Sequence, residues 1–209
     1  APYTGCILNQ HNKSQNDGRT KFYGAYGSTP RLVINGGIIS PAANYSSASI
    51  FTPYVGQTSP VEISILQNKF NGADMVQQVK IKTVAVHSYT TAKIYIAIAE
   101  DTILYTGPNG ETMHFDVFRK ALTDSNGLAI NVPVNVGDSL VLDYTTPLNA
   151  AWTAGKLLSV VILQETGTNA VIQAEKTIAA QNDSIVTLGT AEMSSVMQVI
   201  KVAPNPVHD

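Results

Sequence analysis

The chain has 209 residues, of which 44% are hydrophobic and only 13% are charged, and its formal net charge is −2 at pH 7. This length is enough for one large or two small domains with a sizeable core. The hydrophobic share excludes a disordered chain, and the charge balance excludes a basic surface for nucleic acid. The remaining polarity comes from Ser, Thr, Asn and Gln, which is typical of β-rich exported proteins.

Cysteine content and apolar runs give little information about the compartment. The single cysteine, Cys6, cannot form a disulfide within the chain, so cysteine usage neither requires nor excludes an oxidising compartment. The longest apolar runs, such as residues 157–163, are far shorter than the roughly 20 residues that a membrane helix needs. Because the first residues lack the regions of a signal peptide, we expect either no export or a signal that has been removed.

Residues 1–24 are polar, and Pro and Gly punctuate the segment that follows. A helix is expected over Lys13–Phe22, although the segment has little apolar stripe. A short strand is expected at residues 32–34, after Pro30 and before a glycine turn. Residues 40–58 are rich in Ser, Ala, Thr and Pro, which fits a linker or a short helix over residues 45–55.

From Val61 onward, apolar and polar residues alternate in segment after segment, which indicates strands. Dipeptides such as Asn71-Gly72 and Asn126-Gly127 separate many of the segments, so an antiparallel sandwich is expected. One helix is expected within this region at residues 115–122, where Phe115, Phe118 and Leu122 would share a face. The expected strands are residues 61–65, 79–86, 94–99, 128–134, 139–144, 157–165 and 170–175.

Several of these segments resemble a known family when they are taken in order. Residues 94–101, 105–112 and 115–122 look like parts of the C-terminal sandwich of the outer membrane protein 28 related family. Residues 160–165 and 170–175 resemble the strand pair that closes that sandwich. The resemblance covers most of residues 59–180, and it implies a β-sandwich that follows a thioredoxin-like domain.

Residues 20–37 resemble the second half of that thioredoxin-like domain. The resemblance implies that Pro30, after Thr29, is the cis proline that faces a redox dithiol. The chain has no Cys-x-x-Cys motif, which such a site needs. If the resemblance holds, the first half of the domain lies upstream of Ala1, on the same precursor or on a partner fragment.

The end of the sequence has a second resemblance. Pro204-Asn205-Pro206, within residues 202–209, is similar to the opening of the C-terminal sorting domain that the type IX secretion system reads. The same tripeptide also occurs in ordinary turns. The resemblance implies export by that route, with the type IX machinery as a partner, and a poorly packed linker at residues 201–209.

Residues with catalytic or metal-binding chemistry are few and scattered. Cys6 is a candidate thiol, but no neighbour in the sequence lowers its pKa, so an inert terminal thiol is the simpler interpretation. Glu100 and Asp101 are adjacent in a strand and should point to opposite faces, which makes them poor catalytic partners. No catalytic, cofactor-binding or metal residues are therefore assigned, and no cofactor is expected. The histidines lack the spacing of a zinc-binding pair: His11, His87, His114 and His208. Three side chains have oxygen ligands of the type that calcium binds, but they lack the spacing of a calcium loop: Asp101, Asn109 and Glu111.

Two side chains are notable because their neighbours in the sequence are apolar. Arg119 has apolar residues beside it, and we expect a structural ion pair with a carboxylate on an adjoining strand rather than a ligand contact. Trp152 lies among alanines, where it either fills part of the core or is exposed for a carbohydrate or protein partner.

Three short motifs resemble the Asp-Ser/Thr-apolar signal for O-glycosylation in bacteria that use the type IX route. They place candidate glycosylation at Thr102, Ser139 and Ser184. Ser184 is the strongest of the three because its setting is polar.

The sequence thus predicts a mainly β protein in which an antiparallel sandwich follows the C-terminal part of a thioredoxin-like α/β domain. The expected parts are residues 1–41 as that C-terminal part, 42–58 as a linker, 59–200 as the sandwich and 201–209 as the start of the sorting-domain linker. The predicted function is non-enzymatic interaction or adhesion, secreted or at a bacterial cell surface, with an unknown ligand. Two alternatives stay open: a thiol-disulfide oxidoreductase or its relic, with its Cys-x-x-Cys upstream of residue 1, and a carbohydrate-binding module.

Overall fold

A computed structural model describes residues 5–25, 31–177 and 181–182 of the chain. The predictions for Pro30, Ser184, His208 and residues 201–209 lie outside these residues. Among the described residues, no helix is long and apolar enough to cross a membrane.

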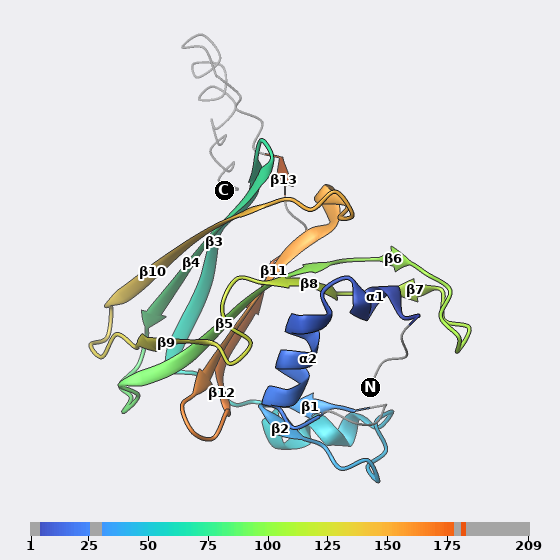
Figure 1. The fold of residues 1–209 in the computed structure, drawn as a ribbon. Helices are drawn as coiled ribbons and strands as arrows, with labels where there is room; N and C mark the ends of the chain where they lie inside the picture. Colours follow the sequence, from blue (N-terminus) through green and yellow to red (C-terminus); the bar gives the residue numbers. More distant parts are fainter. Residues whose placement is uncertain (1–4, 26–30, 178–180, 183–209) are drawn as a thin grey trace, which may run out of the picture.

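Two stacked sheets form the main part of the fold (Figure 1). The first sheet has the order β10-β4-β3-β13, where β3 is Val61–Asn71, β4 is Asp74–Thr83, β10 is Ser139–Pro147 and β13 is Gln181–Asn182. In the second sheet the order is β12-β11-β5-β8, and β9 also pairs with β5. The strands of this sheet are β5, Thr91–Glu100; β8, Val117–Ala121; β9, Leu128–Asn131; β11, Leu157–Glu165; and β12, Val171–Lys176. Within both sheets, every described pair except β13–β3 is antiparallel, which confirms the predicted class of fold.

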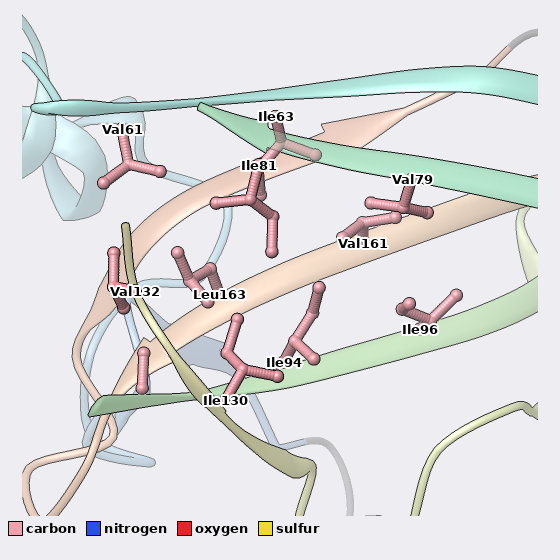
Figure 2. Packing of buried hydrophobic residues seen from close by; sticks show 11 residues of the cluster. Val61, Ile63, Val79, Ile81, Ile94, Ile96, Ile130, Val132, Val161 and Leu163 are labelled. Carbon is pink, nitrogen blue, oxygen red and sulfur yellow. The ribbon is translucent and has the colours of Figure 1, made fainter. Parts of the chain in front are cut away.

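The core lies between the two sheets because one face of each strand is apolar. In β4, every second residue from Met75 to Thr83 is buried, as the period of a strand requires. Figure 2 shows that side chains of β3 and β4 point toward those of β5, β9 and β11. Burying an aliphatic side chain stabilises the fold by about 1.5–3 kcal/mol, so this interface is a major source of stability. Its buried members are Val61, Ile63, Val79, Ile81, Ala92, Ile94, Ile96, Ile130, Val132, Val161 and Leu163.

Strand β5 is buried almost along its whole length, because the second sheet is also covered on its outer face. Ile94, Ile96 and Ile98 belong to the clusters between the sheets. Tyr95 and Ala97 belong to a separate buried cluster with Ala121 of β8. Helix α2, Lys13–Phe22, covers this outer face near Tyr95 (Figure 1).

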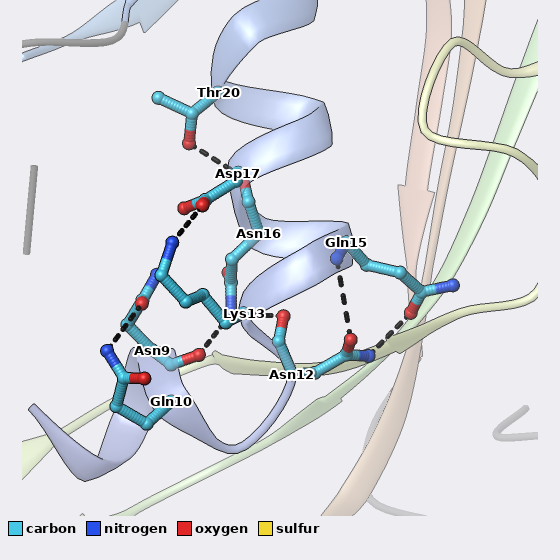
Figure 3. A network of polar contacts seen from close by, with 8 residues as sticks. All are labelled: Asn9, Gln10, Asn12, Lys13, Gln15, Asn16, Asp17 and Thr20. Carbon is cyan, nitrogen blue, oxygen red and sulfur yellow. Dashed lines mark hydrogen bonds and ion pairs between the residues drawn. The ribbon is translucent and has the colours of Figure 1, made fainter.

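Helix α2 confirms the predicted helix, and it contacts the sheet through polar side chains. The Gln15 side chain accepts from the Ala121 backbone N–H at 2.9 Å and donates to the Ala121 carbonyl at 3.1 Å. Asn12, the residue that caps the helix, donates to the Arg119 carbonyl at 3.1 Å. Figure 3 shows these two side chains bonded to each other at the start of the helix. The helix thus satisfies backbone groups along the outer edge of β8.

Arg19 holds the other end of α2 against the sheet. Its guanidinium lies over the Tyr95 ring, 3.9 Å from the centroid, and also over the ring of Tyr23. One Nη donates to the Ser125 carbonyl at 2.9 Å, and the other donates to Gln164 Oε1 at 2.6 Å. Burial lowers the pKa of Arg19 and raises the pKa of Tyr95 to about 12. A desolvated cation on aromatic faces contributes up to about 2 kcal/mol, which compensates for the missing apolar stripe of the helix.

A small hairpin of β1, Val33–Ile34, and β2, Gly37–Ile38, includes the end of the strand expected at residues 32–34. Its turn is Asn35-Gly36, and both residues have positive φ. The turn packs tightly on the loop before β12, because a Cβ on Gly36 would lie 1.9 Å from the Asn169 carbonyl oxygen. The Asn35 side chain accepts from the Val171 backbone N–H at 2.9 Å.

The remaining elements are short. Helix α1 is Ile7–Gln10, and β6, Ile103–Leu104, forms a hairpin with β7, Met113–His114. The 3-10 helices of the described residues are η1 at Ala48–Tyr54 and η2 at Ala154–Lys156. Of the two possibilities left open for residues 40–58, η1 corresponds to the short helix.

The helix expected at residues 115–122 was wrong. Residues 117–121 form strand β8, which pairs with β5, and Phe115 is 63% exposed rather than part of a shared apolar face. The pairing contains a bulge: Ile98 lies opposite Lys120 while Ala99 lies opposite Phe118, so Arg119 is an extra residue in β8. The extra residue interrupts the period of two and brings Phe118 and Leu122 into a spacing that resembles a helix.

Candidate binding site

An open cleft of about 390 Å³ lies where the N-terminal helices contact the second sheet. It joins the start of α2, the bulged strand β8 and the loop that follows β10. These three segments are far apart in the sequence, so the cleft exists only in the folded chain. It is lined by His11, Asn12, Gln15, Arg119, Lys120, Pro147, Leu148, Asn149 and Trp152.

Arg119 and Glu100 form a buried ion pair at one wall of the cleft. The Arg119 Nε donates to Glu100 Oε2 at 2.8 Å, and the side chains are 8% and 2% exposed. Glu100 ends β5, and its second oxygen accepts from the Thr153 backbone N–H at 3.0 Å. Because both carboxylate oxygens have a donor, the charge of Glu100 is well compensated despite its burial.

The bulge in β8 explains how Arg119 can contact Glu100 and line the cleft as well. A bulge turns a side chain away from the direction that regular pairing would give it. Within the described residues, the guanidinium makes its hydrogen bonds through Nε alone, so its two terminal nitrogens remain available at the cleft. Glu100 therefore orients the guanidinium without using all of its donors.

His11 and Trp152 meet across the cleft. The indole Nε1 donates to His11 Nε2 at 2.7 Å, and the two rings are 6.1 Å apart at their centroids. His11 accepts this bond with an unprotonated nitrogen, so the bond requires the neutral imidazole. Burial, and to a smaller extent the charge of Arg119, lowers the pKa of His11, whereas Glu100 acts in the opposite direction.

Trp152 is partly packed in the core and partly exposed at the cleft. One side packs against the buried cluster of Phe70, Met75, Ile98 and Leu157. The residue is only half-buried, and it also lines the cleft. The loop before it is held by Asn149, whose side chain accepts from the Ala151 N–H at 2.9 Å.

Lys120 supplies a second positive charge next to Arg119. Its Nζ donates to the hydroxyl of Thr146 in β10 at 2.6 Å. The hydroxyl is neutral, so this bond positions the ammonium without cancelling its charge. Sequence reasoning missed Lys120, and also His11 as its neighbour across the cleft, because no local motif links residue 11 to residue 120.

The other residues named from the sequence lie away from the cleft lining. Cys6 is the half-buried residue before α1 and is a free thiol. Ser139 is exposed at the first position of β10, whereas Thr102 is half-buried and donates to Asp101 at 3.2 Å. His87 contacts Thr83 and Pro133, and His114 contacts the Tyr105 carbonyl.

The described residues contain no cluster of three or more His, Cys, Asp or Glu side chains that could hold a metal ion. Of the oxygen ligands considered for calcium, Asn109 bonds Glu111 at 3.4 Å. Asp101 bonds the hydroxyl of its neighbour Thr102 instead.

A second open cleft of about 450 Å³ lies between η1 and β12. Tyr54 and Tyr89 line it together with the amide side chains of Gln57 and Gln173. None of the described residues that line it is charged. Several of its amides are already bonded to the backbone: Gln57 to the Pro53 carbonyl, Gln173 to Val61 and Asn35 to Val171.

Comparison with solved structures finds a similar fold in HBP35 of Porphyromonas gingivalis. The TM-score is 0.65 at 12% sequence identity, over 85% of this chain and 62% of that one. This chain therefore corresponds to less than two thirds of that protein, and the low identity establishes similarity of fold alone. A domain of the outer membrane lipoprotein Omp28 from the same organism matches at a TM-score of 0.42 and 11% identity, over 61% of this chain and 93% of that one. No protein-family model and no curated protein matches the sequence.

Proposed function

We propose that this chain is a non-enzymatic interaction module, secreted or held at a bacterial cell surface, that belongs to the outer membrane protein 28 related family. The observation that carries the proposal is the polar cleft at Arg119, Lys120 and Trp152. Its two charged side chains are positioned by hydrogen bonds, and an aromatic ring lies beside them. Ligand sites are concave and combine apolar or aromatic walls with a few precisely placed polar groups, as this cleft does.

The arrangement supports binding better than catalysis. Glu100 has both oxygens occupied by donors, so it is poorly placed to act as a general base. His11 receives the indole N–H at the nitrogen that would have to accept a proton. These groups hold the walls of the cleft in place, and a bound partner would gain from that rigidity.

Export by the type IX route, with O-glycosylation at Ser184, Thr102 or Ser139, is the accompanying part of the proposal. It rests on the sequence resemblances at residues 202–209 and at the three short motifs. Intact mass and terminal sequencing of the protein from its native source test both. A sugar-sized mass increment that disappears in a triple alanine variant supports glycosylation, and an unmodified mass contradicts it.

The location and the binding role are tested together on whole cells. Cells of the native host that produce the tagged full-length protein are treated with protease before lysis, and a periplasmic protein serves as the protected control. Loss of the tagged protein alone supports surface exposure. The purified chain is then tested for retention on cells or host matrix, with heat-unfolded chain as the control. Protection from protease together with no retention would contradict the proposal.

Carbohydrate binding is a second candidate because of the neutral cleft with Tyr54 and Tyr89. Aromatic faces and amide groups are suited to the apolar and hydroxyl faces of a neutral sugar. A glycan array probed with the wild-type chain and with Tyr89→Ala tests this function. Binding that Tyr89→Ala removes supports it, whereas an array without signal counts against it.

A further inference from the structure

The cleft beside Trp152 contains positive charge without a matching acid at its surface. Of the described residues that line it, none is Asp or Glu, while Arg119 and Lys120 both contribute. Helix α2 also begins there, with Asn12 at its cap, so the positive end of the helix dipole faces the same region. The two cationic side chains and the helix dipole all favour the binding of an anion.

The balance of charges in the cleft indicates what charge that anion should carry. The charge of Arg119 is balanced by Glu100 at 2.8 Å, and the bond from Trp152 requires neutral His11. Lys120 bonds a neutral hydroxyl, so its charge remains. One uncompensated positive charge matches a monoanion such as a carboxylate better than a phosphate dianion.

The geometry of the donors agrees with this count. The terminal nitrogens of Arg119 form a planar fork, which matches the two oxygens of a carboxylate. Glu100 and the bulge at residue 119 fix the orientation of the fork before any ligand arrives. The ring of Trp152, with Pro147 and Leu148, supplies an apolar wall for the part of the ligand that bears the acid.

We propose that this cleft binds a carboxylate group, with the two acid oxygens on the terminal nitrogens of Arg119, the charge of Lys120 beside them, and the adjoining part of the ligand against Trp152. The proposal rests on the proposed function, and it names the chemical class that the interaction module recognises. The carboxylate has two natural sources at a cell surface, an acidic sugar and the C-terminal end of a peptide.

The test uses the full chain and two pairs of probes that differ only in the acid. D-glucuronate is compared with D-glucose, and an acetylated tripeptide with a free C-terminus is compared with its C-terminal amide. Because Trp152 is the only tryptophan in the sequence, its fluorescence reports directly on the cleft. Isothermal titration calorimetry gives the affinity independently. Binding of glucuronate but not glucose identifies an acidic sugar, and binding of the free peptide but not its amide identifies a peptide end.

Variants decide whether the cleft is responsible. Lys120→Gln should weaken carboxylate binding by about tenfold, the range expected when one well-placed ionic contact is lost. Lys80→Gln on β4 makes the same change of net charge in the other sheet and should leave the affinity unchanged. Replacing Arg119 and Glu100 together by methionine removes the fork without leaving a buried charge, and it should abolish binding while circular dichroism shows an intact fold.

Equal binding of acid and neutral probes would overturn the proposal, and so would an affinity that Lys120→Gln leaves unchanged. Absence of binding by all four probes would overturn it as well. The proposed function has a separate readout, because retention on cells that survives Lys120→Gln would keep the interaction role and remove this cleft from it.

Discussion

Trp152 donates its indole N–H to Nε2 of His11, a residue 141 positions earlier in the chain, at 2.7 Å. The bond joins the segment before α2 to the loop after β10, and both residues line the cleft. It also couples the cleft to pH, because the accepting nitrogen is the one that a proton would occupy.

The first prediction concerns this coupling. The pKa of His11 is lowered in the folded chain by burial and by Arg119, so folding favours the neutral imidazole. The resulting stability is present above the unfolded pKa of about 6.5, and it is lost as pH falls through the lower folded pKa. We expect Trp152 fluorescence to change in a single step below pH 6.5. The variant His11→Gln, which keeps an acceptor without a titrating group, should show no such step; a step that persists would assign it to another group.

The second prediction concerns the buried ion pair. Glu100→Gln removes the negative partner of Arg119 and leaves a buried cation uncompensated, so the free energy of unfolding should fall by roughly 3–5 kcal/mol. The double methionine variant of these two residues removes both charges and should be about as stable as the wild type. Urea unfolding followed by circular dichroism measures both. A cost of less than about 1 kcal/mol for Glu100→Gln would contradict a buried ion pair, because that is the range of exposed pairs.

Much of the sandwich could be predicted because its strands follow a period of two. The alternation in β4 directly reflects which side chains lie between the sheets. In β5, which is buried on both faces, the isoleucines at every second position lie between the sheets. Prediction failed at residues 115–122, where the bulge at Arg119 breaks that period and leaves a spacing that resembles a helix. Arg119 was notable in the sequence as a charge among apolar neighbours, but its partner depends on the register of two strands.

The cleft itself could not be predicted in the same way. His11, Lys120 and Trp152 are brought together by tertiary contacts, and no local pattern encodes those contacts. Helix α2 was predicted from its own residues, but its position on the outer face of the second sheet was not predicted. Its attachment depends on a few polar bonds and on Arg19 rather than on an apolar stripe, and such bonds have no sequence period.

The third prediction uses Tyr95 beneath Arg19. Burial raises its pKa to about 12 from an ordinary value of 10. The neutral phenol is therefore favoured by folding, and its contribution is fully present below about pH 10 and lost as pH rises through the folded value. The free energy of unfolding should fall by roughly 2–3 kcal/mol over this interval. In Tyr95→Phe this part of the decline should disappear. Identical profiles for the two proteins would contradict the assignment.

The fourth prediction concerns the polar attachment of α2. Gln15→Ala removes the amide that satisfies both backbone groups of Ala121. We expect a loss of roughly 1–3 kcal/mol, because two backbone groups at the sheet edge lose their partners. The matched control is Gln10→Ala in α1, where an exposed side chain donates to its neighbour Asn9 and to no other described residue (Figure 3). Hydrogen exchange at the Ala121 amide should accelerate in the first variant and not in the second, and equal rates in both would count against this attachment.

The amide of Gln15 imitates a neighbouring strand, since it offers one acceptor and one donor to the backbone of β8 as a paired residue would. An uncovered strand edge is a template on which other chains can assemble. Helix α2 therefore covers an edge on which other copies of the sandwich could assemble. A chain without its first two helices would lose the contacts of Gln15 and Arg19 and would also expose the edge of β8, so we expect it to be less stable and to aggregate more readily.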